Sequence, residues 1–312
     1  MKDFQFLNKI HKRVYFLLIP LFLFLIFIVL FAISSILKIW LEQNKVMSVP
    51  FKISQEARMP IIKTEFIPVI SARGAIIMDA DSKVVLYSKN PGIISSTAST
   101  AKIMTALTAL DYFKPTDILT VREATSEGST LGLVQNEKMT FENLLYALLL
   151  PSANDAALAI SQNYPGQEQA FIKAMNDKAK VFKLYNTHYS DPAGLLDAGD
   201  YTTPFDMARL ASFAVKNKTL KEIVATKERV ISDTSGIFVY SLVNLNKLLG
   251  TDGVNGIKTG YTEEAGQVLV TSKEEKGKTI IIVVMGSGDR FMDTAKLLDL
   301  VSNNLTYLSI HP

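Results

Sequence analysis

An apolar segment near the N-terminus constrains this chain most. Residues 14–37 form a run of 24 positions without a charged side chain. As a helix rising 1.5 Å per residue, this run spans roughly 36 Å, more than the ~30 Å hydrocarbon core of a bilayer. Lys9, Lys12 and Arg13 precede it, which favours a cytoplasmic N-terminus. We therefore predict a cytoplasmic tail over 1–13, a single transmembrane helix over 14–37 in contact with the lipid bilayer, and an extracytoplasmic remainder held at the cell membrane.

A cleaved signal peptide is the alternative for this segment. Residues 32–34 loosely resemble a cleavage site, but the apolar part of a signal peptide is usually ~7–15 residues long. The length of the run favours a retained anchor. Under either interpretation the rest of the chain is exported.

Charge and composition exclude several classes of protein. Residues 1–45 hold six of the 33 Lys and Arg and two of the 30 Asp and Glu, which leaves 27 positive and 28 negative residues beyond them. This balance gives no support for a nucleic-acid partner. The chain has no cysteine and three scattered histidines, His11, His188 and His311, so we expect no disulfide scaffold, no metal site and no cofactor.

The exported part has the pattern of an α+β domain. Residues 38–68 contain Pro50, Pro60 and Pro68 without a clear period and predict a linker, followed by one domain over 69–312. Strands are predicted at 74–78, 84–87, 267–271 and 279–285. Helices are predicted at 97–110, 141–150, 203–215 and 292–305, and residues 155–160 are predicted to start another. We expect an antiparallel sheet formed by both ends of the domain, with helices on its faces and a helical insert.

A Ser-x-x-Lys motif, Ser99 to Lys102, opens the first predicted helix. Residues i and i+3 share a helix face, so the Lys102 amine can reach the Ser99 hydroxyl. A second copy, Ser35 to Lys38, lies at the membrane edge and is read as part of the anchor. Taken alone, the first copy is also compatible with a capping serine and a solvated lysine.

Two further motifs follow in the chain. Ser152 to Asn154 forms a Ser-x-Asn after a predicted helix and a proline, and residues 302–304 repeat that pattern. Lys258 to Gly260 is the sole Lys-Thr-Gly, and it leads towards the strand at 267–271. Alone, the Ser-x-Asn is compatible with helix capping and the Lys-Thr-Gly with a surface turn.

The three motifs together, in this order, resemble those of penicillin-binding proteins and class A β-lactamases. Their surroundings at 91–110, 144–157 and 253–266 resemble the D-alanyl-D-alanine carboxypeptidases, the low-molecular-mass penicillin-binding proteins. The resemblance covers roughly residues 69–305. It implies the penicillin-binding protein/β-lactamase-like transpeptidase fold.

The resemblance also implies catalytic roles. Ser99 would be the acylated nucleophile, Lys102 its general base, and Ser152 a proton relay to the leaving amine. Asn154 would hold Lys102 and bind the substrate amide. Lys258 would lie close to Lys102 and help to keep that amine neutral.

The remaining site residues are implied by the same resemblance. Lys258, Thr259 and Gly260 would bind the substrate's terminal carboxylate, with Arg290 as a loose match to the family's arginine. The main-chain N–H groups of Ser99 and Tyr261 would form the oxyanion hole.

The implied reaction removes the terminal D-alanine from a peptidoglycan stem peptide through an acyl-enzyme, and β-lactams would acylate the same serine as covalent inhibitors. The sequence departs from the family where Asp200 replaces a frequent histidine. The second, all-β domain and C-terminal anchor of many relatives are expected to be absent.

Three alternatives stay open. A DD-endopeptidase would use the same residues on peptidoglycan cross-links. A class A β-lactamase would need a Glu-x-x-Leu-Asn pattern, which is not found between Asn154 and Lys258. An anchored binding protein without catalysis is disfavoured by the intact motifs.

Overall fold

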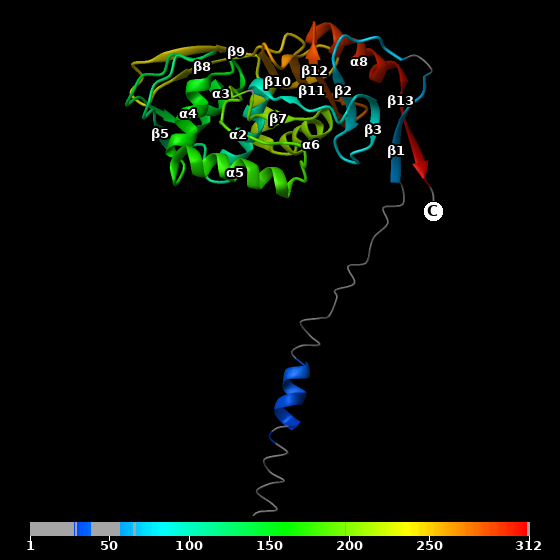
Figure 1. Cartoon of the computed structure of the whole chain (residues 1–312), viewed down its shortest axis with the longest axis horizontal. Helices are drawn as coiled ribbons and strands as arrows, with labels where there is room; N and C mark the ends of the chain where they lie inside the picture. Colours follow the sequence, from blue (N-terminus) through cyan, green and yellow to red (C-terminus); the bar gives the residue numbers. More distant parts are fainter. Residues whose placement is uncertain (1–27, 29, 39–56, 65–66, 197, 311–312) are drawn as a thin grey trace, which may run out of the picture. The chain divides into compact units, whose positions relative to one another are not determined.

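The computed structural model describes residues 28, 30–38, 57–64, 67–196 and 198–310 (Figure 1). The chain divides into two compact units, Met1–Gln55 and Glu56–Pro312. In the first unit, residues 30–38 are helical. None of the helices among the described residues combines the length and apolarity needed to cross a bilayer. Residues 14–27 and 29 of the predicted transmembrane helix lie outside the described residues, so that helix stays a prediction.

A five-stranded antiparallel sheet forms the centre of the second unit. Its strand order is β10-β11-β12-β2-β3. The bounds of these strands are β2 Gly74–Asp79, β3 Val85–Lys89, β10 Val254–Thr262, β11 Gly266–Glu275 and β12 Lys278–Ser287. Strand β2 pairs with β12 from the far end of the domain, with Met78 opposite Ile281. The prediction that both ends of the domain build one sheet is confirmed.

The central strands are apolar on both faces because helices cover both faces. In β2, Ile76 and Met78 enter one hydrophobic cluster, whereas Ala75 and Ile77 enter another. This alternation follows from the period of two of a β-strand. Near-continuous apolar runs are what burial on both faces requires.

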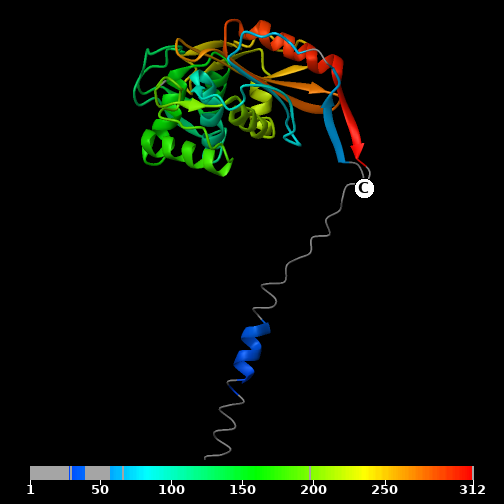
Figure 2. The ribbon, with the colours of Figure 1, turned by 45° about the vertical axis from the view of Figure 1, so that its right-hand side comes forward.

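One helix covers the first face, and a helical insert covers the second (Figures 1 and 2). Helix α8, Arg290–Asn304, packs on one face through Leu297 and Val301. The insert contains the short 3-10 helix η1 Ala98–Ala101, then α2 Lys102–Ala109, α3 Phe141–Leu149, α4 Asn154–Asn163, α5 Gln167–Val181, α6 Pro204–Ala214 and α7 Lys218–Val224. All eight residues of α2 are buried, so this helix runs through the middle of the insert.

Local capping determines where several helices begin. The Thr140 side chain accepts a hydrogen bond from Asn143 N at the start of α3, and Thr203 does the same for Asp206 N at the start of α6. Pro204 occupies the first turn of α6, where its missing N–H costs nothing. These signals agree with the predicted helices at 141–150 and 203–215.

Four two-stranded sheets complete the described part of this unit. They are β1 Ala57–Ile62 with β13 Leu305–Ile310, β4 Ser95–Ser96 with β7 Tyr201–Thr202, β5 Ile118–Thr120 with β6 Lys138–Thr140, and β8 Glu228–Ser232 with β9 Val239–Val243. Strand β1 lies inside the predicted linker 38–68. That boundary was wrong: pairing with β13 places residues 57–62 in the folded unit.

Candidate active site

Ser99 lies in η1, immediately before α2. Its neighbour Ala98 is fully buried and has φ of 43°, a left-handed conformation that is costly for a residue with a Cβ. Such strain persists where surrounding packing fixes the backbone, and it occurs often at functional sites. The Ser99 side chain is half-buried, so a reactant can still approach it.

The Lys102 amine contacts Ser99 directly. Its Nζ lies 2.9 Å from Ser99 Oγ, 2.7 Å from Asn154 Oδ1 and 2.9 Å from the main-chain oxygen of Ala193. The Lys102 side chain is fully buried, and this burial lowers its pKa to about 7. The structure thus joins the first two motifs and gives one lysine the neutral form that an exposed lysine lacks.

Two carboxylates act against this shift without cancelling it. Asp155 and Asp191 both raise the pKa of Lys102, but burial has the larger effect. Asp155 is itself occupied, because its carboxylate accepts hydrogen bonds from three successive main-chain N–H groups, those of Leu131, Gly132 and Leu133.

The Ser-x-Asn motif lies at the start of α4. Ser152 has φ of 68°, and its Oγ is buried without a hydrogen-bond partner among the described residues. Asn154 is held by two main-chain oxygens, since its Nδ2 donates to Glu127 O at 2.8 Å and its N donates to Ser129 O at 2.7 Å. This leaves the Asn154 Oδ1 atom directed at Lys102.

The Lys-Thr-Gly motif lies within strand β10, at the edge of the sheet. Lys258 is 2% exposed and its Nζ donates to Thr259 O at 2.9 Å. Burial, then Lys102, then Arg290 lower the pKa of Lys258 well below its ordinary value. Lys102 and Lys258 are therefore close enough to interact electrostatically, as expected. Because repulsion between two ammonium groups is mutual, each disfavours the charged form of the other, and burial is the largest effect at both.

Gly260 permits a close approach between β10 and η1. A Cβ at this position would lie 3.1 Å from Ala98 Cβ and 3.2 Å from Ser99 N. The sheet edge thus packs against the N–H of the candidate nucleophile. Arg290 Nη1 donates to Gly260 O at 2.7 Å, so the loosely matched arginine does reach this motif. The next residue, Tyr261, keeps an exposed side chain.

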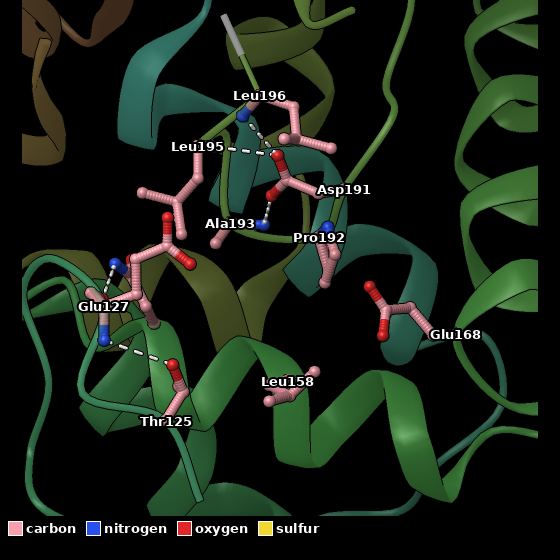
Figure 3. Close-up of a pocket in the computed structure, with 10 residues that line it drawn as sticks. Thr125, Glu127, Leu158, Glu168, Asp191, Pro192, Ala193, Leu195 and Leu196 are labelled. Atoms are coloured by element: carbon pink, nitrogen blue, oxygen red, sulfur yellow. Dashed lines mark hydrogen bonds between the residues drawn. The ribbon is translucent and has the colours of Figure 1, made fainter. Parts of the chain in front are cut away.

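Sequence reasoning missed a loop that supplies the third contact of Lys102. The Asp191 carboxylate accepts hydrogen bonds of 2.6–2.8 Å from the N–H groups of Ala193, Gly194, Leu195 and Leu196. Figure 3 shows those from Ala193, Leu195 and Leu196. These bonds fold the loop so that the Ala193 carbonyl meets Lys102. The residues Asp-Pro-Ala-Gly at 191–194 do indicate a turn in the sequence. The contact with Lys102 could not be predicted, because any residue type can supply a main-chain carbonyl.

A cavity of about 210 Å³ adjoins this loop. Asn154 and Ala193, both of which contact Lys102, also line it, and the Glu168 carboxylate points into it (Figure 3).

The serines of the two duplicate motifs have other hydrogen-bond partners. Ser35 is in the exposed helix at 30–38 and donates to Phe31 O at 2.9 Å. Ser302 lies in α8 and donates to Asp252 Oδ2 and Leu298 O. Within the described ranges, no group of three or more His, Asp or Glu side chains is arranged to hold a metal ion.

Residues 62–289 match the family described as D-alanyl-D-alanine carboxypeptidase. The chain belongs to the D-alanyl-D-alanine carboxypeptidase family. This identifies it as a peptidase of the low-molecular-mass penicillin-binding type, with the α+β fold that the motifs implied.

Relatives within this family carry two kinds of name. The chain is 34% identical to D-alanyl-D-alanine carboxypeptidase DacF of Bacillus subtilis over 73% of this chain and 61% of the relative. It is 29% identical to a D-alanyl-D-alanine endopeptidase of Escherichia coli over 80% of this chain and 84% of the relative. The chain therefore spans less than two thirds of DacF but most of the endopeptidase.

A solved structure agrees with these matches. The crystal structure of the Streptomyces K15 DD-transpeptidase superposes with a TM-score of 0.71 at 32% identity, covering 75% of this chain and 98% of that one. The carboxypeptidase family membership thus rests on both sequence and fold.

Proposed function

We propose that this chain is a serine D-Ala-D-Ala carboxypeptidase that forms an acyl-enzyme on Ser99. The observation that carries the proposal is the 2.9 Å contact between Ser99 Oγ and the buried Lys102 Nζ, whose pKa is lowered to about 7. A neutral amine has two hydrogens and one lone pair. Asn154 Oδ1 and Ala193 O accept the two hydrogens, so the lone pair faces the Ser99 hydroxyl.

Acylation follows from this arrangement. Lys102 takes the hydroxyl proton as Ser99 Oγ attacks the carbonyl carbon between the two D-alanines. The N–H groups of Ser99 and Tyr261 stabilise the oxyanion. The C–N bond then breaks, and Ser152 passes a proton to the leaving amine of D-alanine. Water hydrolyses the ester and restores Ser99.

The substrate's terminal carboxylate binds beside the Lys-Thr-Gly motif. Lys258, the Thr259 hydroxyl and Arg290 supply the cationic and polar groups, with Gly260 allowing the close approach. In the free protein the pKa of Lys258 is well below its ordinary value. A bound carboxylate favours the ammonium form, so substrate binding and protonation of Lys258 are coupled.

The test is covalent labelling followed by product analysis. Wild type incubated with a penicillin should gain the mass of one penicillin, mapped to the peptide that contains Ser99, and the Ser99→Ala variant should gain none. Wild type should also release D-alanine from a linear stem pentapeptide. Equal labelling of both proteins, or no labelling of wild type, contradicts the proposal.

A second candidate is a DD-endopeptidase acting on cross-links. It is favoured by the match to the Escherichia coli endopeptidase, which covers more of both chains than the DacF match does. Digestion of purified cross-linked muropeptides beside linear pentapeptides separates the two. Faster cleavage of the cross-linked substrate would favour the endopeptidase.

We also propose that residues 14–37 anchor the enzyme in the cell membrane, with the N-terminus cytoplasmic. The 24-residue uncharged run and the positive residues before it support this. The full chain should stay in the membrane fraction after an alkaline wash, and a chain starting at residue 38 should not. Recovery of the full chain in the soluble fraction would contradict the anchor.

A further inference from the structure

Two buried carboxyl groups lie together beneath the loop that contacts Lys102. Asp200 is fully buried and Asp191 is 8% exposed. Burial, and then a side-chain hydrogen bond between the two carboxyl groups, raise the pKa of Asp200. Hydrogen bonds from Asp200 and from main-chain N–H groups lower the pKa of Asp191, although burial acts in the opposite direction. One proton shared between two carboxyls avoids placing two like charges at one buried site.

The hydrogen bonds indicate which group carries the proton. Asp191 accepts four N–H bonds and is therefore suited to the charged form. Asp200 accepts fewer N–H bonds, one to its Oδ1 from Ser190 at 2.6 Å and one from the main-chain N–H of Asp191. Asp200 Oδ2 is buried and receives no N–H or O–H from the described residues, as expected of an oxygen that is itself the donor. Burial then raises the pKa of Asp200 to about 8.

The pair is connected to the reacting serine through the loop. The Ala193 carbonyl accepts from Lys102 at 2.9 Å. Gly194 fits so closely against η1 that a Cβ there would lie 2.0 Å from Ala98 O. A shift of the Asp191 carboxylate therefore moves groups that touch both Lys102 and the residue before Ser99.

We propose that Asp200 is a positioning residue for acylation: its carboxyl proton binds Asp191, and this bond keeps the 191–196 loop against Lys102. The inference rests on the proposed acylation of Ser99. Loss of the proton would place two negative charges side by side, loosen the loop and withdraw the Ala193 carbonyl from Lys102.

The surroundings of the pair do not offset a second negative charge. The titratable or charged groups nearby, taken from every adjoining element, are Lys102 of α2, Asp155 of α4, Glu168 of α5, Asp206 and Arg209 of α6, and His188 and Tyr189 of the preceding segment. Three of these are further carboxyl groups, and the charge of Arg209 acts on one of them, Asp206. Lys102 must be neutral to act as the base, so its positive charge is not available to the pair during acylation.

The experiment measures penicillin acylation against pH in wild type, Asp200→Asn and Asp206→Asn. The rate in wild type should rise as Lys102 loses its proton near pH 7. Above about pH 8 it should fall by about tenfold for each pH unit, as for any single deprotonation that inactivates. The amide of Asp200→Asn donates to Asp191 at every pH, so the alkaline fall should disappear. Asp206 is also a buried carboxyl, but it bonds to Asn186 and Thr187 rather than to the loop. Asp206→Asn should therefore keep the alkaline fall in the acylation rate.

The outcomes separate this inference from the proposed function. A wild type that forms no penicillin adduct refutes the acylation of Ser99. A labelled wild type whose alkaline fall persists unchanged in Asp200→Asn refutes the role of Asp200 alone. Infrared spectroscopy of wild type tests the proton without any variant: a protonated-carboxyl band should be present at pH 7 and lost as the pH passes about 8. Absence of that band at pH 7 also overturns the inference.

Discussion

Replacing Lys102 by Met should separate the stability of this protein from its activity. The two side chains have similar length, and Met carries no charge to desolvate. Lowering a lysine pKa from 10.5 to about 7 disfavours the buried ammonium by roughly 5 kcal/mol, at ~1.4 kcal/mol for each pH unit. Natural active sites commonly retain such costs in stability for the sake of function.

The sign of the effect follows from proton binding. Between about pH 7 and pH 10.5 the unfolded chain holds a proton on Lys102 that the folded chain does not. The free energy of unfolding of wild type therefore rises with pH across this window, and below pH 7 the penalty is fully present. Lys102→Met lacks this contribution, so its stability relative to wild type should decrease by roughly 4 kcal/mol from pH 7 to pH 10.

Urea unfolding at pH 7 and pH 10 measures this difference. The stability of Lys102→Met relative to wild type is measured at each pH, and the two values are subtracted. This removes the cost of leaving Asn154 Oδ1 and Ala193 O without their donor, because that cost is the same at both pH values. Lys218→Met, the same change at an exposed position, serves as the control and should show little dependence on pH. Equal stability differences for Lys102→Met at both pH values would refute a neutral, buried Lys102.

Three further variants test other parts of the site and its support. Gly194→Ala and Gly236→Ala both force a Cβ onto left-handed backbone, at a cost of about 1–2 kcal/mol, but only the first places that Cβ 2.0 Å from a main-chain oxygen. Gly194→Ala should cost about 1–3 kcal/mol more in urea unfolding, and equal costs would contradict the close packing. Asn154→Asp puts a carboxylate on Lys102 and should move the rise in penicillin acylation to higher pH by at least ~1 unit, so an unchanged midpoint speaks against this contact. Asp293→Ala leaves buried N–H and O–H donors unpaired on the α8 face and should lower stability by about 2–4 kcal/mol. Penicillin labelling of Asp293→Ala, measured per folded molecule, should persist. Loss of this labelling would show that the α8 face contributes to the site.

The parts of the fold that sequence predicted are those with strong apolar patterns. The strands at 74–78 and 279–285 were recognised because burial on both faces makes them almost continuously apolar. Helix α5 was missed because Phe171, Met175 and Ala179 are its only fully buried residues. Strand β10 was missed because its Asn, Lys and Gly residues resemble a loop, although pairing with β11 satisfies its backbone.

The same division applies to the candidate site. The contact between Ser99 and Lys102 could be predicted because a spacing of three residues on a helix is local geometry. The Ala193 carbonyl could not, because a loop brings in a main-chain atom from 91 residues away. The strong effect of burial on the pKa of Lys102 also depends on packing, which the motifs do not encode.

The strand order of the central sheet has a consequence for biosynthesis. The β2–β3 hairpin is translated early, but its partner β12 ends only at Ser287. The strand that carries Lys258 joins the sheet through β11, which in turn needs β12. A nascent chain already containing Ser99 and Lys102 therefore has no completed sheet against which to assemble them. The candidate site should therefore assemble late, once β12 is available to pair with both β2 and β11, so a chain truncated before Lys278 should not be acylated by a penicillin.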